Sequence, residues 1–153
     1  MYILIILLTM AVLPIVSISL DHAFHPAMPI VIQIARWFVF WAAGVRLGLA
    51  GVRQLVQPSF TAEHIFHISS DEALPLVREL GVANISIAVV ALLSLAISTF
   101  VIPAALYAVI FYGIAGIRHV AEQNRSFNEN IAMASDLYIS VLFIAILVAI
   151  WVH

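Results

Sequence analysis

The chain contains very few charged residues. Only 9% of its 153 residues are Asp, Glu, Lys or Arg, whereas 65% are hydrophobic. A soluble domain of this length needs more charge to cover the surface that it shows to water. The composition therefore excludes an ordinary soluble domain and predicts an integral membrane protein with a single domain.

Cysteine and lysine are absent altogether. The lack of cysteine excludes thiol redox chemistry, disulfide bonds and cysteine-ligated metals. Because lysine is missing, every basic residue is an arginine, which tolerates partial burial and bidentate pairing better than lysine does. These residues are Arg36, Arg46, Arg53, Arg78, Arg118 and Arg125. The formal net charge of −2 argues against nucleic acid as a partner.

Common catalytic motifs are also missing. The sequence contains no phosphate-binding loop, no catalytic serine motif and no dinucleotide-binding fingerprint. It has no internal repeat, which argues against the usual architecture of a secondary transporter. These absences favour a non-enzymatic role.

Long apolar runs predict an all-α fold with five membrane crossings. The run at residues 1–20 lacks a basic flank and a cleavage site, so we expect a retained helix, kinked near Pro14, rather than a signal peptide. Four further helices are expected at residues 30–57, 81–100, 103–121 and 131–152. We therefore predict an integral membrane helical bundle. Residues 30–153 would form a four-helix transmembrane bundle, and residues 1–20 would add an N-terminal transmembrane helix.

The polar segment at residues 58–80 and the positions of the arginines predict how the bundle sits in the membrane. The segment carries Ile65, Phe66, Leu74 and Val77, which should keep it at the membrane surface as an interfacial loop. All arginines except Arg36 and Arg46 lie near the side on which the N-terminus begins. The positive-inside rule places that side in the cytoplasm. We expect a protein of the cell inner membrane, with its N-terminus cytoplasmic and its C-terminus outside, in the periplasm.

Arg46 lies deep inside the second expected helix, where a permanent charge needs partners. A rise of about 1.5 Å per residue puts it roughly 4–5 Å from the midplane, on the cytoplasmic side. Asp136 falls about 8 Å from the midplane on the same side. Residues of the last four helices thus form one predicted polar layer, which is also the candidate ligand-binding set. Its members are Arg46, Arg53, Glu79, Asn84, Tyr112, Arg118, His119, Glu129 and Asp136.

Two interpretations of this layer are open. In the first, Arg46 and Asp136 form an ion pair that only holds the bundle together, because buried charges need partners in any protein. In the second, the layer is a pocket that binds a lipid headgroup or a quinone. The need for a counter-charge favours the first interpretation.

His64 and His67, which lie three residues apart, and His119 are candidate metal ligands. A zinc or similar site needs three or four such ligands. The short spacing is unspecific. Hydrogen bonding at the membrane surface is therefore the favoured interpretation of these histidines, and a metal site is not favoured.

Four segments of the sequence carry a family resemblance. They are FWAAGVRLGLAGVRQLVQPSFTAEHIF, VRELGVANISI, YGIAGIRH and NENIAMASDLYI. They resemble a family of small bacterial membrane proteins of unknown function, which is distantly similar to the DoxX-like four-helix membrane proteins. The resemblance covers about residues 36–148, implies a DoxX-like four-helix core and leaves the first helix outside it. It directs attention to Arg46, Arg53, Pro58, Glu79, Asn84, Gly116, His119, Glu129 and Asp136.

The resemblance implies no established activity. Some DoxX-like proteins are similar to subunits of quinone-linked oxidoreductases, and others are accessory or assembly factors. Cysteine-dependent redox roles cannot carry over to a chain without cysteine.

The first functional hypothesis is a non-enzymatic accessory or assembly subunit of a larger or self-associated membrane complex. Its partners would be membrane lipids and either further copies of the chain or other membrane subunits. Small-residue stripes such as Gly44–Gly48–Gly51 and Gly113–Gly116 would allow close helix contacts. The alternatives are a quinone- or lipid-binding protein, a small transporter or proton path, and a metal enzyme.

Overall fold

The computed structural model describes residues 2–122 and 125–152. Within these ranges helices are the regular secondary structure, without strands, as the apolar runs predict. Five helices in the described residues are long and apolar enough to cross a membrane. They are Ile3–Phe24, Ile30–Val56, Asp71–Leu93, Ser98–Ala121 and Phe127–Val152.

Several of these helices are built from more than one element. The N-terminal helix comprises α1 (Tyr2–Leu7), the π-helical segment η1 (Leu8–Val12) and α2 (Leu13–Phe24). The next comprises α3 (Ile30–Phe38), the π-helical η2 (Val39–Val45) and α4 (Arg46–Val56), followed by the short α5 (Pro58–His64). The remaining elements are η3 (Asp71–Ala73), α6 (Leu74–Leu93), η4 (Ser98–Phe100), α7 (Val101–Ala121) and α8 (Phe127–Val152).

Two helix starts differ from the sequence prediction. α6 begins at Leu74, seven residues before the expected Gly81. Ser70 caps η3 by accepting a hydrogen bond from the Glu72 backbone, and Pro75 follows in the first turn of α6. These are ordinary start signals, so the interfacial segment is shorter than 58–80. α8 begins at Phe127 rather than residue 131 because Ser126 and Glu129 form a capping box.

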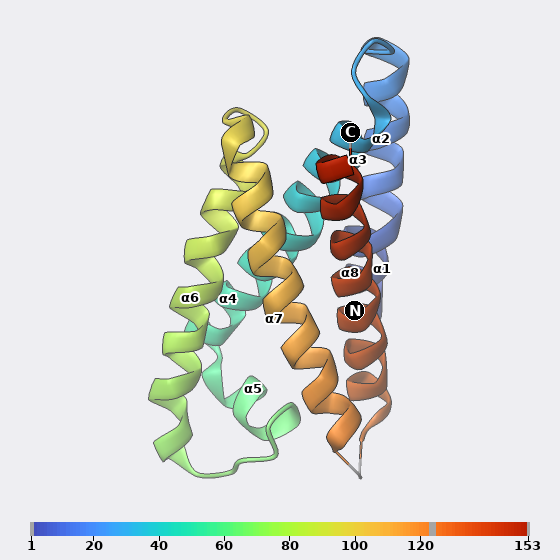
Figure 1. Cartoon of the computed structure of the whole chain (residues 1–153). Coiled ribbons are helices and arrows are strands. Elements are labelled where there is room, and N and C mark those ends of the chain that lie inside the picture. The colour runs from blue at the N-terminus through green and yellow to red at the C-terminus, as the bar shows by residue number, and fades with distance from the viewer. Residues whose placement is uncertain (1, 123–124, 153) are drawn as a thin grey trace.

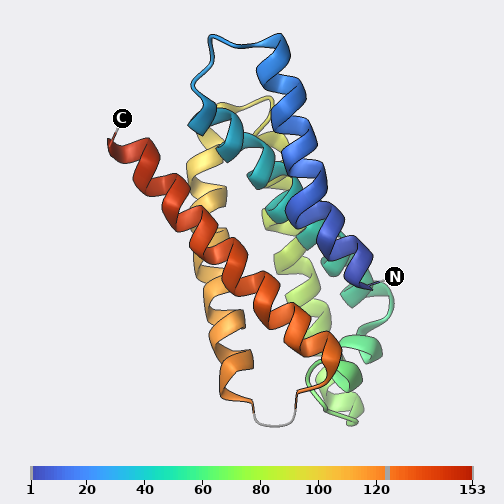
Figure 2. The ribbon, with the colours of Figure 1, turned by 90° about the vertical axis from the view of Figure 1, so that its right-hand side faces the viewer.

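The four C-terminal long helices pack as two pairs. α4 lies along α6, and α7 lies along α8, whereas α6 and α7 meet mainly near the turn at η4 (Figure 1). The pairs diverge toward the end that carries α5, which we call the α5 end. Figure 2 shows α8 crossing the bundle diagonally from the α5 end to the opposite end. This divergence leaves space between the pairs at the α5 end.

Glycines bring the helices of each pair into close contact. A Cβ atom on Gly51 would lie 2.7 Å from the Gly81 carbonyl oxygen, so α4 and α6 touch through their backbones. On α7, a Cβ on Gly116 would lie 2.7 Å from the Leu137 side chain of α8. The small-residue stripes are therefore used for packing inside the chain.

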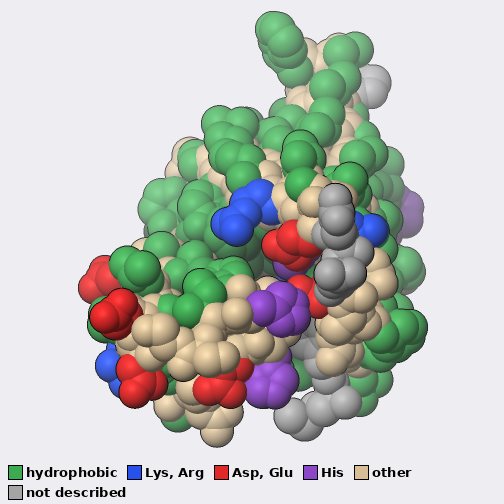
Figure 3. Space-filling model, turned by 90° about the horizontal axis from the view of Figure 1, so that it is seen from below, with side chains coloured by type: hydrophobic (Ala, Val, Ile, Leu, Met, Phe, Trp, Pro, Cys, Tyr) green, Lys and Arg blue, Asp and Glu red, His purple; other side chains and the backbone are tan. Residues whose placement is uncertain are grey.

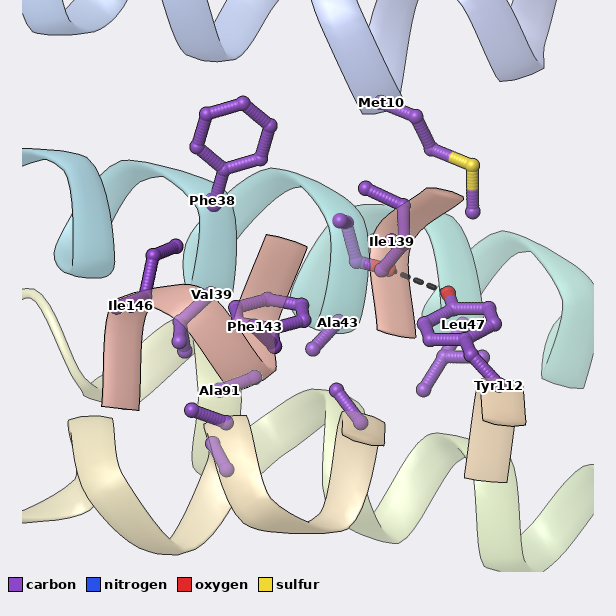
Figure 4. Packing of buried hydrophobic residues seen from close by; sticks show 14 of the residues in the cluster. Met10, Phe38, Val39, Ala43, Leu47, Ala91, Tyr112, Ile139, Phe143 and Ile146 are labelled. Carbon is purple, nitrogen blue, oxygen red and sulfur yellow. Dashed lines mark hydrogen bonds between the residues drawn. The ribbon is translucent and has the colours of Figure 1, made fainter. Parts of the chain in front are cut away.

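The half of the bundle away from α5 is filled by apolar side chains (Figure 4). Val39, Ala91, Ile139 and Phe143 are fully buried there. Many of the core residues are alanines, whose small side chains let the helices approach one another. We call this region the closed half.

The N-terminal helix is held to the bundle by two tryptophans of the next helix. Trp37 Nε1 donates to Asp21 Oδ2 at 2.9 Å, and Trp41 Nε1 donates to Ser17 Oγ at 2.9 Å. The π-helical η1 ends at Val12, two residues before Pro14. Because proline lacks a backbone N–H, it disturbs the hydrogen bonding of the helix here, where the sequence predicts a kink.

Candidate functional site

A cavity of about 520 Å³ lies between the two helix pairs at the α5 end. α4 and α6 line one side of the cavity, and α7 and α8 line the other. α5 contributes Phe60 and Thr61, and the N-terminal helix contributes Ile5 and Ile6. Seen from the α5 end, the surface is hollowed beside basic and acidic side chains, with histidines nearby (Figure 3).

Three arginines from different positions line the cavity. Arg46 stands at the start of α4, Arg53 lies two turns further along the same helix, and Arg118 comes from the last turn of α7. The guanidinium carbon of Arg53 lies 3.4 Å from the centre of the Phe60 ring, which is a cation–π contact that positions α5 against α4.

Two carboxylates face these cations. Asp136, on α8, is only 8% exposed, and it interacts electrostatically with Arg46 and His119. Glu122 follows α7, and its Oε2 lies 3.2 Å from His119 Nδ1. The arginines outnumber the carboxylates, so the lining carries one formal positive charge. A direct Arg46–Asp136 ion pair stays a prediction.

A buried amide pair connects α4 and α6 beside the cavity. Asn84 Nδ2 donates to Gln54 Oε1 at 2.9 Å, and both side chains are buried. The other polar atom of Asn84, Oδ1, is buried and has no hydrogen-bond partner among the described residues. A buried acceptor without a donor costs free energy.

The cavity borders the lipid-facing surface of the bundle. Leu49 of α4 and Ile110 and Ile114 of α7 line it, and each of these side chains is about half exposed. Tyr107 and Phe111 add a stacked aromatic pair with ring centroids 5.6 Å apart. The site therefore combines a charged interior with an apolar side opening.

Tyr112 forms the boundary between the cavity and the closed half. Its hydroxyl donates to the Ala42 carbonyl of η2 at 2.6 Å, and the side chain is 1% exposed (Figure 4). This bond gives the η2 carbonyl a partner where the helix departs from α-helical winding.

A second polar cluster lies at the rim of the cavity. Glu129 is fully buried near the start of α8, and its Oε2 accepts the Ser126 backbone N–H at 2.6 Å. Its Oε1 lies 2.9 Å from Nε2 of His67, which belongs to the segment after α5. His119 and Glu122 are close by.

The structure brings together most of the predicted polar layer. Seven of the predicted residues line the cavity: Arg46, Arg53, Asn84, Tyr112, Arg118, His119 and Asp136. Glu79 is exposed on α6 and does not line the cavity, and Glu129 belongs to the rim cluster instead. Of the predicted metal ligands, His64 stacks on Phe60 and is not in the group that His119 forms with Glu122 and Glu129, whereas His67 contacts Glu129.

Gln54 and Glu122 line the cavity but are not among the predicted site residues. Gln54 lies two four-residue steps after Arg46, by way of Ala50, and so at the edge of the same stripe of α4, which is a signal that could have identified it. Glu122 lies three residues after His119, and these two side chains share the end of α7.

Comparison with known proteins identifies a family without an assigned activity. The model of a family of unknown function, DUF6790, matches residues 1–153, and the chain belongs to this family. The match includes the N-terminal helix, which the resemblance found in the sequence left out. No curated protein and no solved structure matches the chain.

Proposed function

We propose that this member of a family of unknown function binds the anionic headgroup of a membrane lipid in the cavity at its α5 end. The observation that carries the proposal is a cavity of about 520 Å³ that is lined by arginines and borders the lipid-facing surface. Its volume lies within the range of small-ligand pockets.

The charge of the lining supports an anionic ligand. Arg46, Arg53 and Arg118 are opposed by only two carboxylates, Asp136 and Glu122. Guanidinium groups bind phosphate oxygens with paired, charge-assisted hydrogen bonds. Because apolar helices surround the cavity, these interactions are screened less than they would be in water.

The excess of arginines distinguishes between phospholipid headgroups. Phosphatidylglycerol has a net negative charge, because its glycerol adds no charge to that of the phosphate. A choline headgroup adds a positive charge, which the arginines would repel.

The apolar side of the cavity supports a ligand with hydrocarbon chains. Leu49, Ile110 and Ile114 line the cavity and are about half exposed. Acyl chains could lie along these residues while the headgroup contacts the arginines. The amphipathic lining thus matches an amphipathic ligand.

A quinone is a second candidate for the same cavity. The stacked pair Tyr107 and Phe111 offers an aromatic surface for a flat ring. A neutral quinone leaves the excess of arginines unexplained, so the anionic lipid is the preferred ligand.

Lipid titration followed by native mass spectrometry tests the proposal. The delipidated protein in mild detergent would receive phosphatidylglycerol, phosphatidylcholine or a quinone in separate titrations. We expect preferential binding of phosphatidylglycerol, and we expect Arg53→Gln or Arg118→Gln to weaken it about tenfold, the effect of losing a charge-assisted hydrogen bond. Arg78→Gln is the matched control, because Arg78 is exposed and does not line the cavity.

Equal binding of the two phospholipids by all of these variants would contradict the proposal. Preferential binding of the quinone, unaffected by the arginine substitutions, would favour the second candidate instead.

We also propose that the protein is an accessory or assembly subunit of a membrane complex, a role with which lipid binding is compatible. The glycine stripes pack inside the chain, so association would have to use other surfaces. Native mass spectrometry of gently extracted protein tests it. A strict monomer without a co-purifying partner would contradict the role.

We further propose that the α5 end faces the cytoplasm. Arg53 contacts Phe60 of α5, and Arg78 and Arg118 lie in the parts of α6 and α7 nearest this end. Arg36, in contrast, donates to the Leu95 carbonyl in the turn at the opposite end. The excess of arginine at one end follows the positive-inside rule.

The absence of cysteine makes this orientation simple to test. Single cysteines would replace exposed Ser59 on α5 and exposed Ala27 at the opposite end. A membrane-impermeant maleimide added to intact cells should label Ala27→Cys and leave Ser59→Cys unlabelled until the membrane is opened. The reverse pattern would overturn the orientation.

A further inference from the structure

The rim cluster joins three separate segments of the chain at the α5 end. His67 lies after α5, His119 and Glu122 lie at the end of α7, and Glu129 lies in the first turn of α8. Potential ligand atoms of His119, Glu122 and Glu129 all lie within 4.8 Å of one another. One histidine and two carboxylates therefore converge on one small region, and His67 contacts this group through Glu129.

The spacing of these atoms suits a shared cation. Zinc binds histidine nitrogen and carboxylate oxygen at about 2.0–2.2 Å, so neighbouring ligand atoms of a tetrahedral site lie roughly 3.3 Å apart. His119 Nδ1 lies 3.2 Å from Glu122 Oε2, and His67 Nε2 lies 2.9 Å from Glu129 Oε1. The nitrogen–oxygen distance in each histidine–glutamate pair is therefore close to the distance between neighbouring ligand atoms of such a site.

The surrounding contacts hold the Glu129 side chain and the backbone at the end of α7 in place. The Ser126 backbone N–H occupies Oε2 of Glu129 and leaves Oε1 directed at His67. Arg125 Nη1 donates to the carbonyls of His119 and Glu122, which fixes the end of α7. Supporting hydrogen bonds of this kind orient the ligands of metal sites.

We propose that His119, Glu122 and Glu129 bind a divalent transition-metal cation of the Zn²⁺ class, with water completing its coordination and His67 held beside it by Glu129. Nitrogen and carboxylate ligands suit such a cation. The His67 side chain is 58% exposed and that of Glu122 is 40% exposed, so the cation can enter from water. Hydrogen bonding accounts for each histidine–glutamate pair alone, whereas a cation accounts for the approach of Glu129 to the His119–Glu122 pair.

The bound cation would link the ends of α7 and α8, and Glu129 would connect it to His67 in the segment after α5. His119 and Glu122 also line the cavity, so the cation would lie at its rim. The proposal concerns the cluster itself and holds whatever the cavity contains.

Cobalt titration tests the site directly. The full-length protein would carry a purification tag without histidine, be treated with chelator in mild detergent and then receive Co²⁺, whose visible absorption reports four-coordinate binding. We expect one equivalent to bind with intense visible bands, and Zn²⁺ to displace it. Glu122→Gln or His119→Asn should weaken binding at least about tenfold.

His64→Asn is the matched control, because His64 lies near His67 in the sequence but stacks on Phe60 outside the cluster. This variant should bind Co²⁺ as the unmodified chain does. Glu122 is only partly buried, so its substitution should leave the fold intact even if a Glu129 variant does not fold. The absence of saturable binding, or equal binding by Glu122→Gln and His119→Asn, would overturn the proposal.

Discussion

Near Phe143 the helices of the bundle meet through side chains that are almost completely buried, whereas around Asp136 the same helices leave a cavity of about 520 Å³. The closed half is filled by alanine, valine, isoleucine and phenylalanine. The cavity half carries arginines, carboxylates and amides. Two regions of one bundle are thus stabilised by different interactions.

This difference follows from how the helix pairs diverge. Close backbone contacts at Gly51 and Gly116 fix α4 to α6 and α7 to α8, but no comparable contact brings α6 to α7 at the α5 end within the described residues. Space between the pairs is filled by apolar side chains at one end and bordered by polar side chains at the other. The stability of the closed half should therefore depend mainly on side-chain volume. The stability of the cavity half should depend mainly on the balance between its positive and negative side chains.

The largest expected effect is the loss of a large side chain from the closed half. Phe143→Ala should lower the free energy of unfolding by about 3–4 kcal/mol, because Phe143 is fully buried and its removal leaves a void. Phe111→Ala should cost about 1 kcal/mol, because Phe111 is only partly buried and already borders empty space. Unfolding in mixed detergent micelles measures both free energies. Equal losses for the two variants would contradict the difference between the closed half and the cavity half.

The next effect concerns the charges of the cavity half. Asp136→Ala alone should cost about 3 kcal/mol, because the partly buried Arg46 would lose a carboxylate with which it interacts. The double variant Arg46→Leu with Asp136→Ala should be more stable than the Asp136 variant alone. If the double variant is no more stable, the two residues are not partners.

A smaller effect distinguishes two glycines of α4. Gly51→Ala should cost about 2 kcal/mol, because the new Cβ would lie 2.7 Å from a backbone oxygen of α6, which cannot move alone. Gly48→Ala is the matched control, because its Cβ would meet only the Ala88 side chain at 3.4 Å, an ordinary contact. Thermal unfolding in detergent should leave the control unchanged, and similar losses for both variants would contradict the backbone contact.

The smallest effect is expected at the start of α8. Ser126→Ala removes one hydrogen bond of the capping box with Glu129 and should cost about 1 kcal/mol. Phe127→Ala, at an exposed neighbouring position, should change stability much less. Both variants can be compared by thermal unfolding, and an equal loss would show that the capping box contributes little.

Much of the fold and part of the site could be predicted from the sequence. Five spans follow from apolar length. The height of a residue in a helix follows from the rise per residue, and Arg46, Asn84 and Asp136, which this rule places at similar heights, line one cavity. The direction in which a side chain points depends on how its helix is rotated by packing. Glu79, expected in the same layer, is therefore exposed on α6.

The cavity itself could not be predicted from the sequence. It depends on the divergence of two helix pairs, which is set by contacts between residues far apart in the chain, such as Gly51 with Gly81. The contact of His67 with Glu129 likewise joins segments 62 residues apart, and no local pattern encodes it. Long-range packing supplies the information that periodicity and composition lack.

The most direct test of lipid binding in the cavity is an experimental structure of the protein in nanodiscs that contain phosphatidylglycerol. We expect headgroup density between Arg46, Arg53 and Arg118, with acyl chains leaving along Ile110 and Ile114. A cavity closed by side chains, or one filled only by water in the presence of this lipid, would contradict lipid binding at this site.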